Sequence, residues 1–341
     1  MNVLVAMSGG VDSSVAAGLL LEAGHDITGV TLRLWGGETD SGCCSVGDVE
    51  DARRVAAQLG VPHYVFNLSE EFETAVVAPY AAAYADGTTP NPCVECNRSI
   101  KFGLLLERAD ALGFDALATG HHARVLRDDD GVMHLRRGVD AGKDQSYVLY
   151  MLGQSELDRT LLPIGEITKA EVREHAARLG LRTADKPESM DVCFVRREDR
   201  REFVDARTSP QPGPMVDTSG RVLAEHAGVA GFTVGQRRGL GVALGEPRYV
   251  VAVDARAATV TIGTRADLAC DHLVVRDLCW VAGAPGPDTA LSVQTRAHGA
   301  TGAGWLDGHV VHLAEPMTHV AAGQVVALYD GDLVVGSGIT A

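Results

Sequence analysis

The sequence AMSGGVDSS at residues 6–14 decides the fold of the chain. The apolar residues 3–6 that lead into it are typical of a buried parallel strand, and the apolar residues 15–21 that follow it are typical of a helix. Gly9 and Gly10 lack a Cβ, so the backbone between strand and helix can turn tightly and approach a ligand closely. The first amides of a helix have no partners within the helix and favour an anion. The sequence therefore predicts a phosphate site.

The side chains of this stretch add polar groups but no lysine. Ser8, Ser13 and Ser14 supply hydroxyl donors, and Asp12 is expected either to cap the helix or to bind a magnesium ion. The usual phosphate loop, G-x-x-x-x-G-K-[ST], places a lysine on the terminal phosphates. The sequence SGGVDS instead resembles the pyrophosphate loop of the N-type ATP pyrophosphatases. That resemblance implies cleavage of ATP between its α and β phosphates, which activates a substrate oxygen as an adenylate. A serine- and glycine-rich turn without a ligand is the alternative.

The length and composition of the chain limit its class. Its 341 residues are too many for one ordinary core and predict two or three domains. No window resembles a membrane span, and residues 1–20 lack the pattern of a signal peptide, so we expect a cytoplasmic protein with no membrane partner. Seven cysteines in a reducing compartment indicate chemistry or metal binding. The formal net charge of −15 by itself argues against a nucleic-acid partner, although a local basic surface can coexist with it.

Strands alternate with helices over the first third of the chain. Strands are predicted at 26–35, 63–68 and 115–119, and helices at 46–59, about 69–84 and 98–112, with Pro79 expected to end or kink the second helix. This alternation predicts a parallel, doubly wound α/β sheet, whose ligands bind beyond the carboxyl ends of the strands. The phosphate loop, Leu32 and Gly120-His121 fall on that edge.

The rest of the chain predicts two further domains. A hairpin is expected around a turn at residues 128–131, and helices then continue to about residue 206. From there on, Gly, Thr and Val alternate in short runs separated by turn residues, which indicates an all-β region. We therefore expect a catalytic domain at 1–206, a small central domain at 207–268 and a C-terminal β-barrel at 269–341.

Three of the cysteines are candidates for chemistry. The sequence NPCVECN at 91–97 places Cys93 and Cys96 in a C-x-x-C beside a predicted helix start, where a thiolate is stabilised, and Cys193 lies much later in the chain. A C-x-x-C can serve redox chemistry, bind a metal or occur by chance, and zinc usually needs four ligands. Cys43 and Cys44 could supply further ligands, although vicinal cysteines rarely chelate one ion well, whereas Cys270 and Cys279 in the β region are expected to be inert packing residues.

Two arginine pairs, 196–197 and 200–201, follow Cys193 closely. Such pairs are often a solvated helix face, but their place beside the cysteine is equally consistent with phosphate binding. Both interpretations stay open.

Several motifs, taken in order, resemble one family over nearly the whole chain: the bacterial tRNA-specific 2-thiouridylases. The motifs are SGGVDS at 8–13, NPCVECN at 91–97, ATGH at 118–121, KDQSY at 143–147, SMDVCF at 189–194 and TVGQRRGL at 233–240. The resemblance implies an ATP-dependent transferase that replaces the C2 oxygen of the wobble uridine by sulfur in the anticodon stem-loop of certain tRNAs. It also implies a pyrophosphatase-type domain, a small central domain and a C-terminal β-barrel. A sulfur donor, such as a cysteine desulfurase or a sulfur-relay protein, is an implied partner.

The resemblance also assigns roles to individual residues. The ATP site would be formed by Ala6, Met7, Ser8, Gly9, Gly10, Val11, Asp12, Ser13, Leu32 and Gly120. The target base would meet Asn91, Pro92 and Cys93. Contacts to tRNA would come from His121, Lys143, Asp144, Gln145, Arg296, Ala297 and Gln324. Cys96 would be the nucleophile and Cys193 the carrier of a persulfide, with a transient disulfide between the two.

Three positions depart from the usual pattern of the family. Cys93 stands where the family commonly has an aspartate proposed as general base, Leu32 where it commonly has methionine, and Ala297 where it commonly has tyrosine. Cys93 leaves two mechanisms open: persulfide chemistry by Cys96 and Cys193, which is favoured, or an iron–sulfur cluster held by all three thiolates. Two other functions also stay open, a synthetase of the same superfamily that acts on a small molecule and a non-catalytic tRNA-binding protein.

Overall fold

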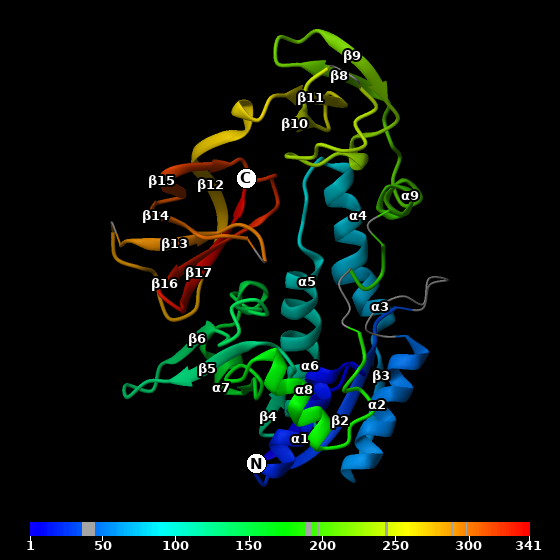
Figure 1. Cartoon of the computed structure of the whole chain (residues 1–341), viewed down its shortest axis with the longest axis vertical. Coiled ribbons are helices and arrows are strands. Elements are labelled where there is room, and N and C mark those ends of the chain that lie inside the picture. Colours follow the sequence, from blue (N-terminus) through cyan, green and yellow to red (C-terminus); the bar gives the residue numbers. More distant parts are fainter. Residues whose placement is uncertain (36–44, 188–191, 197, 243–244, 288, 298) are drawn as a thin grey trace.

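The computed structural model describes residues 1–35, 45–187, 192–196, 198–242, 245–287, 289–297 and 299–341. Figure 1 shows the N-terminal sheet and its helices at the bottom, a central β domain at the top and a β-barrel beside them. Some residues considered above lie outside the described residues, namely Cys43, Cys44, residues 189–191 and Arg197.

The N-terminal part is built on a five-stranded parallel sheet, as predicted. Its strands are β1 (Asn2–Ala6), β2 (Asp26–Arg33), β3 (His63–Asn67), β4 (Ala116–Ala118) and β7 (Thr160–Leu161), in the order β3-β2-β1-β4-β7. Alternate residues of β1 face different cores, since Val3 and Val5 belong to one apolar cluster and Leu4 to another. Both faces of the sheet are therefore covered, which is the doubly wound arrangement. The two-residue strand β7 is too short for a sequence pattern to predict.

One face of the sheet is covered by α1 (Val11–Glu22), α2 (Val46–Leu59) and α8 (Lys169–Arg178). Helix α2 has the predicted bounds because a capping residue defines each of its ends. The hydroxyl of Ser45 accepts a hydrogen bond from the amide of Asp48, and Gly60 ends the helix in the left-handed conformation with φ 73°.

Two interrupted helices cover the other face. The first runs through α3 (Ser69–Phe72), the π-helical η1 (Glu73–Val77) and α4 (Ala78–Ala85). Pro79 does not end this helix but lies in the first turn of α4, directly after the π-helical segment. A π turn is wider than an α turn, so it leaves room for a ring that would otherwise clash with the carbonyl four residues earlier.

The second interrupted helix runs through α5 (Pro92–Glu95), the π-helical η2 (Cys96–Leu104) and α6 (Leu105–Ala111). It begins at residue 92 rather than at the predicted residue 98. Asn91 caps it, with Oδ1 accepting from the amide of Cys93 at 3.1 Å, and proline suits the first helical position. Both cysteines of the C-x-x-C are therefore helical.

The predicted hairpin joins the N-terminal part to the barrel. Its strands β5 (Ala123–Arg127) and β6 (Met133–Arg137) flank the expected turn at 128–131. Strand β6 pairs with β17 (Leu333–Thr340) of the C-terminal sheet. Asp332 strengthens the junction because its carboxylate accepts hydrogen bonds from Arg124 and Arg136.

The barrel is closed, because β12 pairs with β15 on one side and with β17 on the other. Its remaining strands are β12 (Ala269–Trp280), β13 (Leu291–Gln294), β14 (Gly302–Asp307), β15 (Val310–Thr318) and β16 (Val325–Asp330). Val293, Val326 and Leu328 are fully buried in its interior cluster. The C-terminal β-barrel is thus confirmed.

The central domain has a four-stranded sheet of its own, in the order β10-β11-β8-β9. Its strands are β8 (Gly213–Asp217), β9 (Val222–His226), β10 (Tyr249–Asp254) and β11 (Thr259–Gly263), and a separate apolar cluster includes Met215, Val250 and Val260. The remaining short helices of the chain are η3 (Ser146–Val148), α7 (Gln154–Asp158), α9 (Arg200–Asp205), η4 (Val229–Gly231) and η5 (Ala266–Leu268). Within the described ranges, no helix combines the length and the apolar character that a membrane span requires.

Candidate active site

The phosphate loop, residues 8–13, lies at the carboxyl edge of the sheet and includes the turn after β1 and the first residues of α1. Gly9 has φ +74°, and a Cβ on it would lie 2.2 Å from the carbonyl oxygen of Asp48, so only glycine fits. Gly10 is the N-cap of α1, and no side chain caps this helix, so the expectation that Asp12 caps it is wrong. The first amides of α1 are therefore left for an anion such as a phosphate.

Asp12 forms an ion pair with a lysine from far along the chain. Its two carboxylate oxygens accept hydrogen bonds from Nζ of Lys169 at 2.7 and 2.8 Å, and one of them lies 3.3 Å from Nε2 of His122. Burial raises the pKa of Asp12, but its hydrogen bonds with His122 and Lys169 and the positive charge of Lys169 outweigh burial and hold this pKa below its ordinary value. Asp12 is therefore ionised, and its charge is matched within the protein.

A magnesium ion on Asp12 would have to share this carboxylate with Lys169. Magnesium takes several oxygen ligands in an octahedron, whereas both oxygens of Asp12 already accept from Lys169. Within the described residues, no group of three or more His, Cys, Asp or Glu side chains could hold a metal ion. Magnesium at Asp12 stays a prediction, and no step below depends on it.

Lys186 holds the other side of the phosphate loop. Its Nζ donates to the carbonyl of Gly9 at 3.0 Å and to the carboxylates of Asp48 and Asp51 at 2.6 and 2.7 Å. Burial lowers the pKa of Lys186, but the two carboxylates more than compensate and raise it above its ordinary value. The loop that has no lysine in its sequence thus has Lys169 and Lys186 beside it in space, which the sequence analysis missed.

Gly120 follows β4 and packs against the first turn of α1. A Cβ on Gly120 would lie 2.6 Å from the amide nitrogen of Ser13 and 2.8 Å from the carbonyl carbon of Asp12, so a larger residue would push α1 away. Met7 and Leu32, also expected at the ATP site, are 1% and 7% exposed and lie in the cores on the two sides of the sheet. Met7 and Leu32 are therefore core residues of the sheet that carries the site.

His121 links the edge of the sheet to the helix that carries Cys96. Its Nδ1 lies 2.7 Å from the hydroxyl of Thr119, and its ring centroid lies 5.9 Å from that of Phe102 in η2. Burial lowers the pKa of His121 well below 6.5, and the positive charge of Lys101 lowers it further. The imidazole is therefore neutral at neutral pH.

Asp144 and Gln145, from the segment 143–145 expected to contact tRNA, make their contacts within the protein. Asp144 is 4% exposed, and its carboxylate accepts from Nη1 of Arg137 at 2.9 Å and from the amide and hydroxyl of Ser146 at 3.0 and 2.9 Å. The side-chain oxygen of Gln145 accepts from the amide of His122 at 2.9 Å. A direct contact between the Asp144 carboxylate and tRNA does not fit this arrangement, because that carboxylate is buried among its donors.

The three candidate cysteines differ in exposure. Cys93 is exposed, Cys193 is half-buried and Cys96 is 8% exposed. An iron–sulfur cluster held by these three thiols does not fit the structure, because they do not form a group that could hold a metal among the described residues. No step below is derived through such a cluster.

An aromatic cluster holds the Cys193 segment at the carboxyl edge of the sheet. The ring of Phe194 lies 6.0 Å from Trp35, which follows β2, and 5.2 Å from Tyr80. Burial raises the pKa of Tyr80, and the neighbouring Tyr84 and Cys93 raise it further. Tyr80 thus lies between the segment of Cys193 and the helix that carries Cys93.

The loop before Asn91-Pro92-Cys93 is held by the barrel. The amide of Thr89 donates to the carbonyl of Ala322 at 2.8 Å, and the side-chain amide of Gln324 donates to the carbonyl of Thr89. Gln324, expected to contact tRNA, therefore also fixes the loop that leads to the target-base residues.

Arg296 and Ala297 occupy a turn after β13. The side-chain amide of Gln294 donates to the carbonyls of both residues at 2.8 and 3.0 Å, which fixes the turn. Ala297 packs against the main apolar cluster, whereas the side chain of Arg296 is exposed.

Comparison with protein families matches all three parts of the chain. Residues 1–197 match the tRNA methyl transferase HUP domain, residues 201–264 the tRNA methyl transferase PRC-barrel domain and residues 270–340 the aminomethyltransferase beta-barrel domain.

Relatives of known name align over their full lengths. A protein of Chloroflexus aurantiacus is 51% identical over 99% of this chain and 97% of its own length. Proteins of Moorella thermoacetica and Mycolicibacterium paratuberculosis are 49% and 48% identical, each over 98% or more of both chains. All three carry the name tRNA-specific 2-thiouridylase MnmA.

Proposed function

The chain belongs to the family of the tRNA-specific 2-thiouridylases, and from this membership we propose that it is an ATP-dependent tRNA-uridine 2-sulfurtransferase acting on the wobble uridine. One observation carries the proposal: three features meet at one edge of the sheet. The phosphate loop follows β1, Trp35 after β2 packs on Phe194 beside Cys193, and His121 after β4 packs on the helix of Cys96. An ATP site and two thiols at one edge suit activation of an oxygen followed by sulfur transfer.

The first step is adenylation of the base. The C2 oxygen of the uridine attacks the α-phosphorus of ATP, the bond to the β-phosphate breaks, and pyrophosphate leaves. The first amides of α1, which no side chain caps, favour this anionic leaving group, and the ion-paired Lys169 and Lys186 hold the loop beside them in place. The target uridine is bound by Asn91, Pro92 and Cys93 at the start of α5, since a base in a single-stranded RNA loop can be turned outward and bound by its edges.

The second step moves sulfur. A donor such as a cysteine desulfurase or a relay protein loads Cys193 with a persulfide, whose terminal sulfur attacks C2, and AMP leaves with the original oxygen. The Cys96 thiolate then attacks the sulfur of Cys193. The bond between the sulfur of Cys193 and the sulfur on C2 of the base breaks, and 2-thiouridine is released. A disulfide then joins Cys96 to Cys193. A dithiol reductant supplies the two electrons that restore both thiols.

The test is a thiolation assay with purified protein, ATP, magnesium, unmodified tRNA and a cysteine desulfurase with cysteine, followed by measurement of 2-thiouridine in digested tRNA. The wild type should form 2-thiouridine, and Cys193→Ala and Cys96→Ala should not. Cys93→Ala should stay active, as should Cys270→Ala, a matched control in the barrel.

Two results would contradict the proposal. The first is a wild type that makes no 2-thiouridine with any donor, and the second is full activity of Cys193→Ala. Stoichiometric iron in anaerobically purified protein, lost together with activity in Cys93→Ala, would replace the persulfide route by cluster chemistry.

A further inference from the structure

Cys93 has no redox step in the chemistry above, yet the structure places it one helical turn before Cys96. The backbone amide of Cys96 donates to the carbonyls of Pro92 and Cys93, so residues 92–96 form one turn of helix. In that geometry the Cα atoms of residues three apart are separated by about 5 Å. A disulfide accepts Cα separations of about 4.4–6.8 Å, so the sulfurs of Cys93 and Cys96 can bond once their side chains rotate towards each other.

The two thiols of this turn differ in their access to other molecules. Cys93 is exposed, whereas Cys96 is 8% exposed and belongs to the main apolar cluster. Cys193, which shares the proposed disulfide with Cys96, is half-buried against the same cluster. The rate of thiol–disulfide exchange depends on access to the sulfur under attack. A protein reductant therefore reaches Cys93 more readily than it reaches a disulfide between Cys96 and Cys193.

Cys93 also lies close to the segment that carries Cys193. Tyr80 connects the two, because its ring lies 5.2 Å from that of Phe194, the residue after Cys193. Burial raises the pKa of Tyr80, and the charge of Cys93 contributes to the same rise, which places Cys93 near the Tyr80 hydroxyl. Since Tyr80, Phe194 and Cys96 belong to one cluster, the three cysteines surround a common region of the site.

We propose that Cys93 is the resolving thiol of the reaction cycle, the thiol that opens the disulfide left by sulfur transfer; this inference rests on the proposed function. The Cys93 thiolate attacks Sγ of Cys96. The bond from Cys96 to Cys193 breaks, a bond from Cys93 to Cys96 forms, and Cys193 leaves as a thiolate. The proton lost by Cys93 is balanced by the proton that Cys193 takes up, and the protein as a whole is neither oxidised nor reduced.

This exchange moves the oxidised bond from the interior towards the surface. Cys193 regains its thiol before any external reductant acts, so the sulfur donor can load it again. A dithiol protein then attacks the exposed sulfur of Cys93, restores both thiols of the C-x-x-C and is itself oxidised to a disulfide. The cysteine that stands where the family commonly has aspartate thus has a redox function of its own.

The first experiment maps the disulfide after one turnover without reductant. Protein loaded by a cysteine desulfurase is mixed with ATP, magnesium and unmodified tRNA, quenched in acid, alkylated, digested and analysed by mass spectrometry. In the wild type we expect most of the oxidised protein to hold a disulfide between Cys93 and Cys96, with Cys193 alkylated. The variant Cys93→Ser should stop at the disulfide between Cys96 and Cys193.

The second experiment measures the rate of later turnovers divided by the rate of the first, which cancels any effect of a variant on base binding. With a protein dithiol of the thioredoxin type as reductant, Cys93→Ser should lower this ratio about tenfold, because the remaining disulfide is poorly accessible. The small dithiol dithiothreitol should restore the ratio. The matched control is Cys270→Ser in the barrel, which should keep the wild-type ratio with both reductants.

The outcomes distinguish this inference from the proposed function. If the wild type forms 2-thiouridine but accumulates the disulfide between Cys96 and Cys193, with Cys93 alkylated, the inference is wrong and the proposed function stands. A wild-type ratio for Cys93→Ser with the protein reductant leads to the same conclusion. If the wild type forms no 2-thiouridine in its first turnover, the proposed function fails, and the inference fails with it.

Discussion

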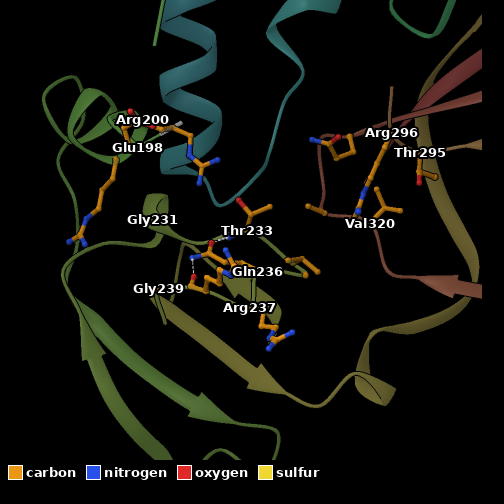
Figure 2. Close-up of a pocket in the computed structure, with 16 residues that line it drawn as sticks. Glu198, Arg200, Gly231, Thr233, Gln236, Arg237, Gly239, Thr295, Arg296 and Val320 are labelled. Atoms are coloured by element: carbon orange, nitrogen blue, oxygen red, sulfur yellow. Dashed lines mark hydrogen bonds between the residues drawn. The ribbon is translucent and has the colours of Figure 1, made fainter. Parts of the chain in front are cut away.

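The phosphate loop and the cavity between α9, the central domain and the barrel are both expected to bind phosphates, yet their charges are arranged differently. At the phosphate loop, Lys169 is paired with Asp12, and Lys186 is paired with Asp48 and Asp51. In the arginine cleft, the cavity lined by Arg200, Arg201, Arg237, Arg238 and Arg296 (Figure 2), four of the five arginines have no carboxylate partner among the described residues, and only Arg201 is paired, with Asp205. A site for one triphosphate benefits from side chains held in fixed geometry, whereas a surface for a long polyanion benefits from net positive charge.

The largest effect on activity is expected from Gly120, whose backbone packs against the first turn of α1 at the phosphate loop. Gly120→Ala places a Cβ 2.6 Å from the amide of Ser13, so α1 must shift. We expect tRNA-dependent pyrophosphate release to fall about 100-fold, because a displacement of about 1 Å in a catalytic site costs that much. Affinity for tRNA should not change.

The control for this variant is Gly302→Ala in the barrel, where a Cβ meets nothing within 4 Å. It should retain wild-type pyrophosphate release. If Gly120→Ala weakened tRNA binding as strongly as it slowed pyrophosphate release, the two sites would not be separable.

The second-largest effect is expected from the ion pair between Lys169 and Asp12 at the phosphate loop. Lys169→Met leaves the carboxylate of Asp12, 31% exposed, without its main partner, so we expect a loss of about 1–2 kcal/mol in the free energy of unfolding. The double variant Asp12→Asn/Lys169→Met should regain most of that loss, since no unpaired charge remains. Urea denaturation of the three variants measures this cycle. Additive losses would show that the pair is not coupled.

Burial of His121 predicts a pH dependence. Because its pKa is well below 6.5 in the folded protein, the unfolded chain takes up the proton first as pH falls. The stabilising contribution is thus fully present above about pH 6.5 and is lost as pH falls towards the folded pKa, by up to about 1.4 kcal/mol per pH unit.

The variant His121→Asn should remove this part of the dependence of unfolding free energy on pH between about 6.5 and 5. His309→Asn, which changes an exposed histidine in the β14–β15 turn, is the control and should keep this pH dependence. An identical pH dependence in wild type and His121→Asn would contradict the assignment.

The smallest effect is expected from Glu198, an acidic residue that lines the arginine cleft. Glu198→Gln removes a negative charge that opposes RNA, so binding of an RNA hairpin that holds only the anticodon stem and loop should tighten about two- to threefold at low salt. The measurement is the affinity for this hairpin over a range of salt concentrations. Weaker binding would mean that Glu198 orients an arginine.

Local sequence predicted those parts of the molecule that are contiguous in the chain. The β1–loop–α1 unit, helix α2 and the hairpin turn at 128–131 all follow from residues within one or two turns of each other. The early start of the α5–η2 helix was missed because its cap, Asn91, was read as part of a proline loop. A capping side chain followed by proline was the available signal.

Long-range partners could not be predicted in this way. Lys169 and Lys186 reach the phosphate loop from more than a hundred residues away, and only their rarity in the sequence marked them. The buried role of Asp144 and the contact of Gln324 with Thr89 depend on how separate elements pack. The arginine cleft is assembled from four segments, at 198–201, 231–239, 295–296 and 320–324, so no single stretch of sequence contains it.

The central claim is that the C2 oxygen of the wobble uridine is activated as an adenylate at the phosphate loop and leaves with AMP. The direct test is a single-turnover reaction with tRNA that carries ¹⁸O at C2 of this uridine, followed by mass spectrometry of the AMP. We predict one ¹⁸O atom in the AMP phosphate for each 2-thiouridine formed. Formation of 2-thiouridine with unlabelled AMP would contradict the claim.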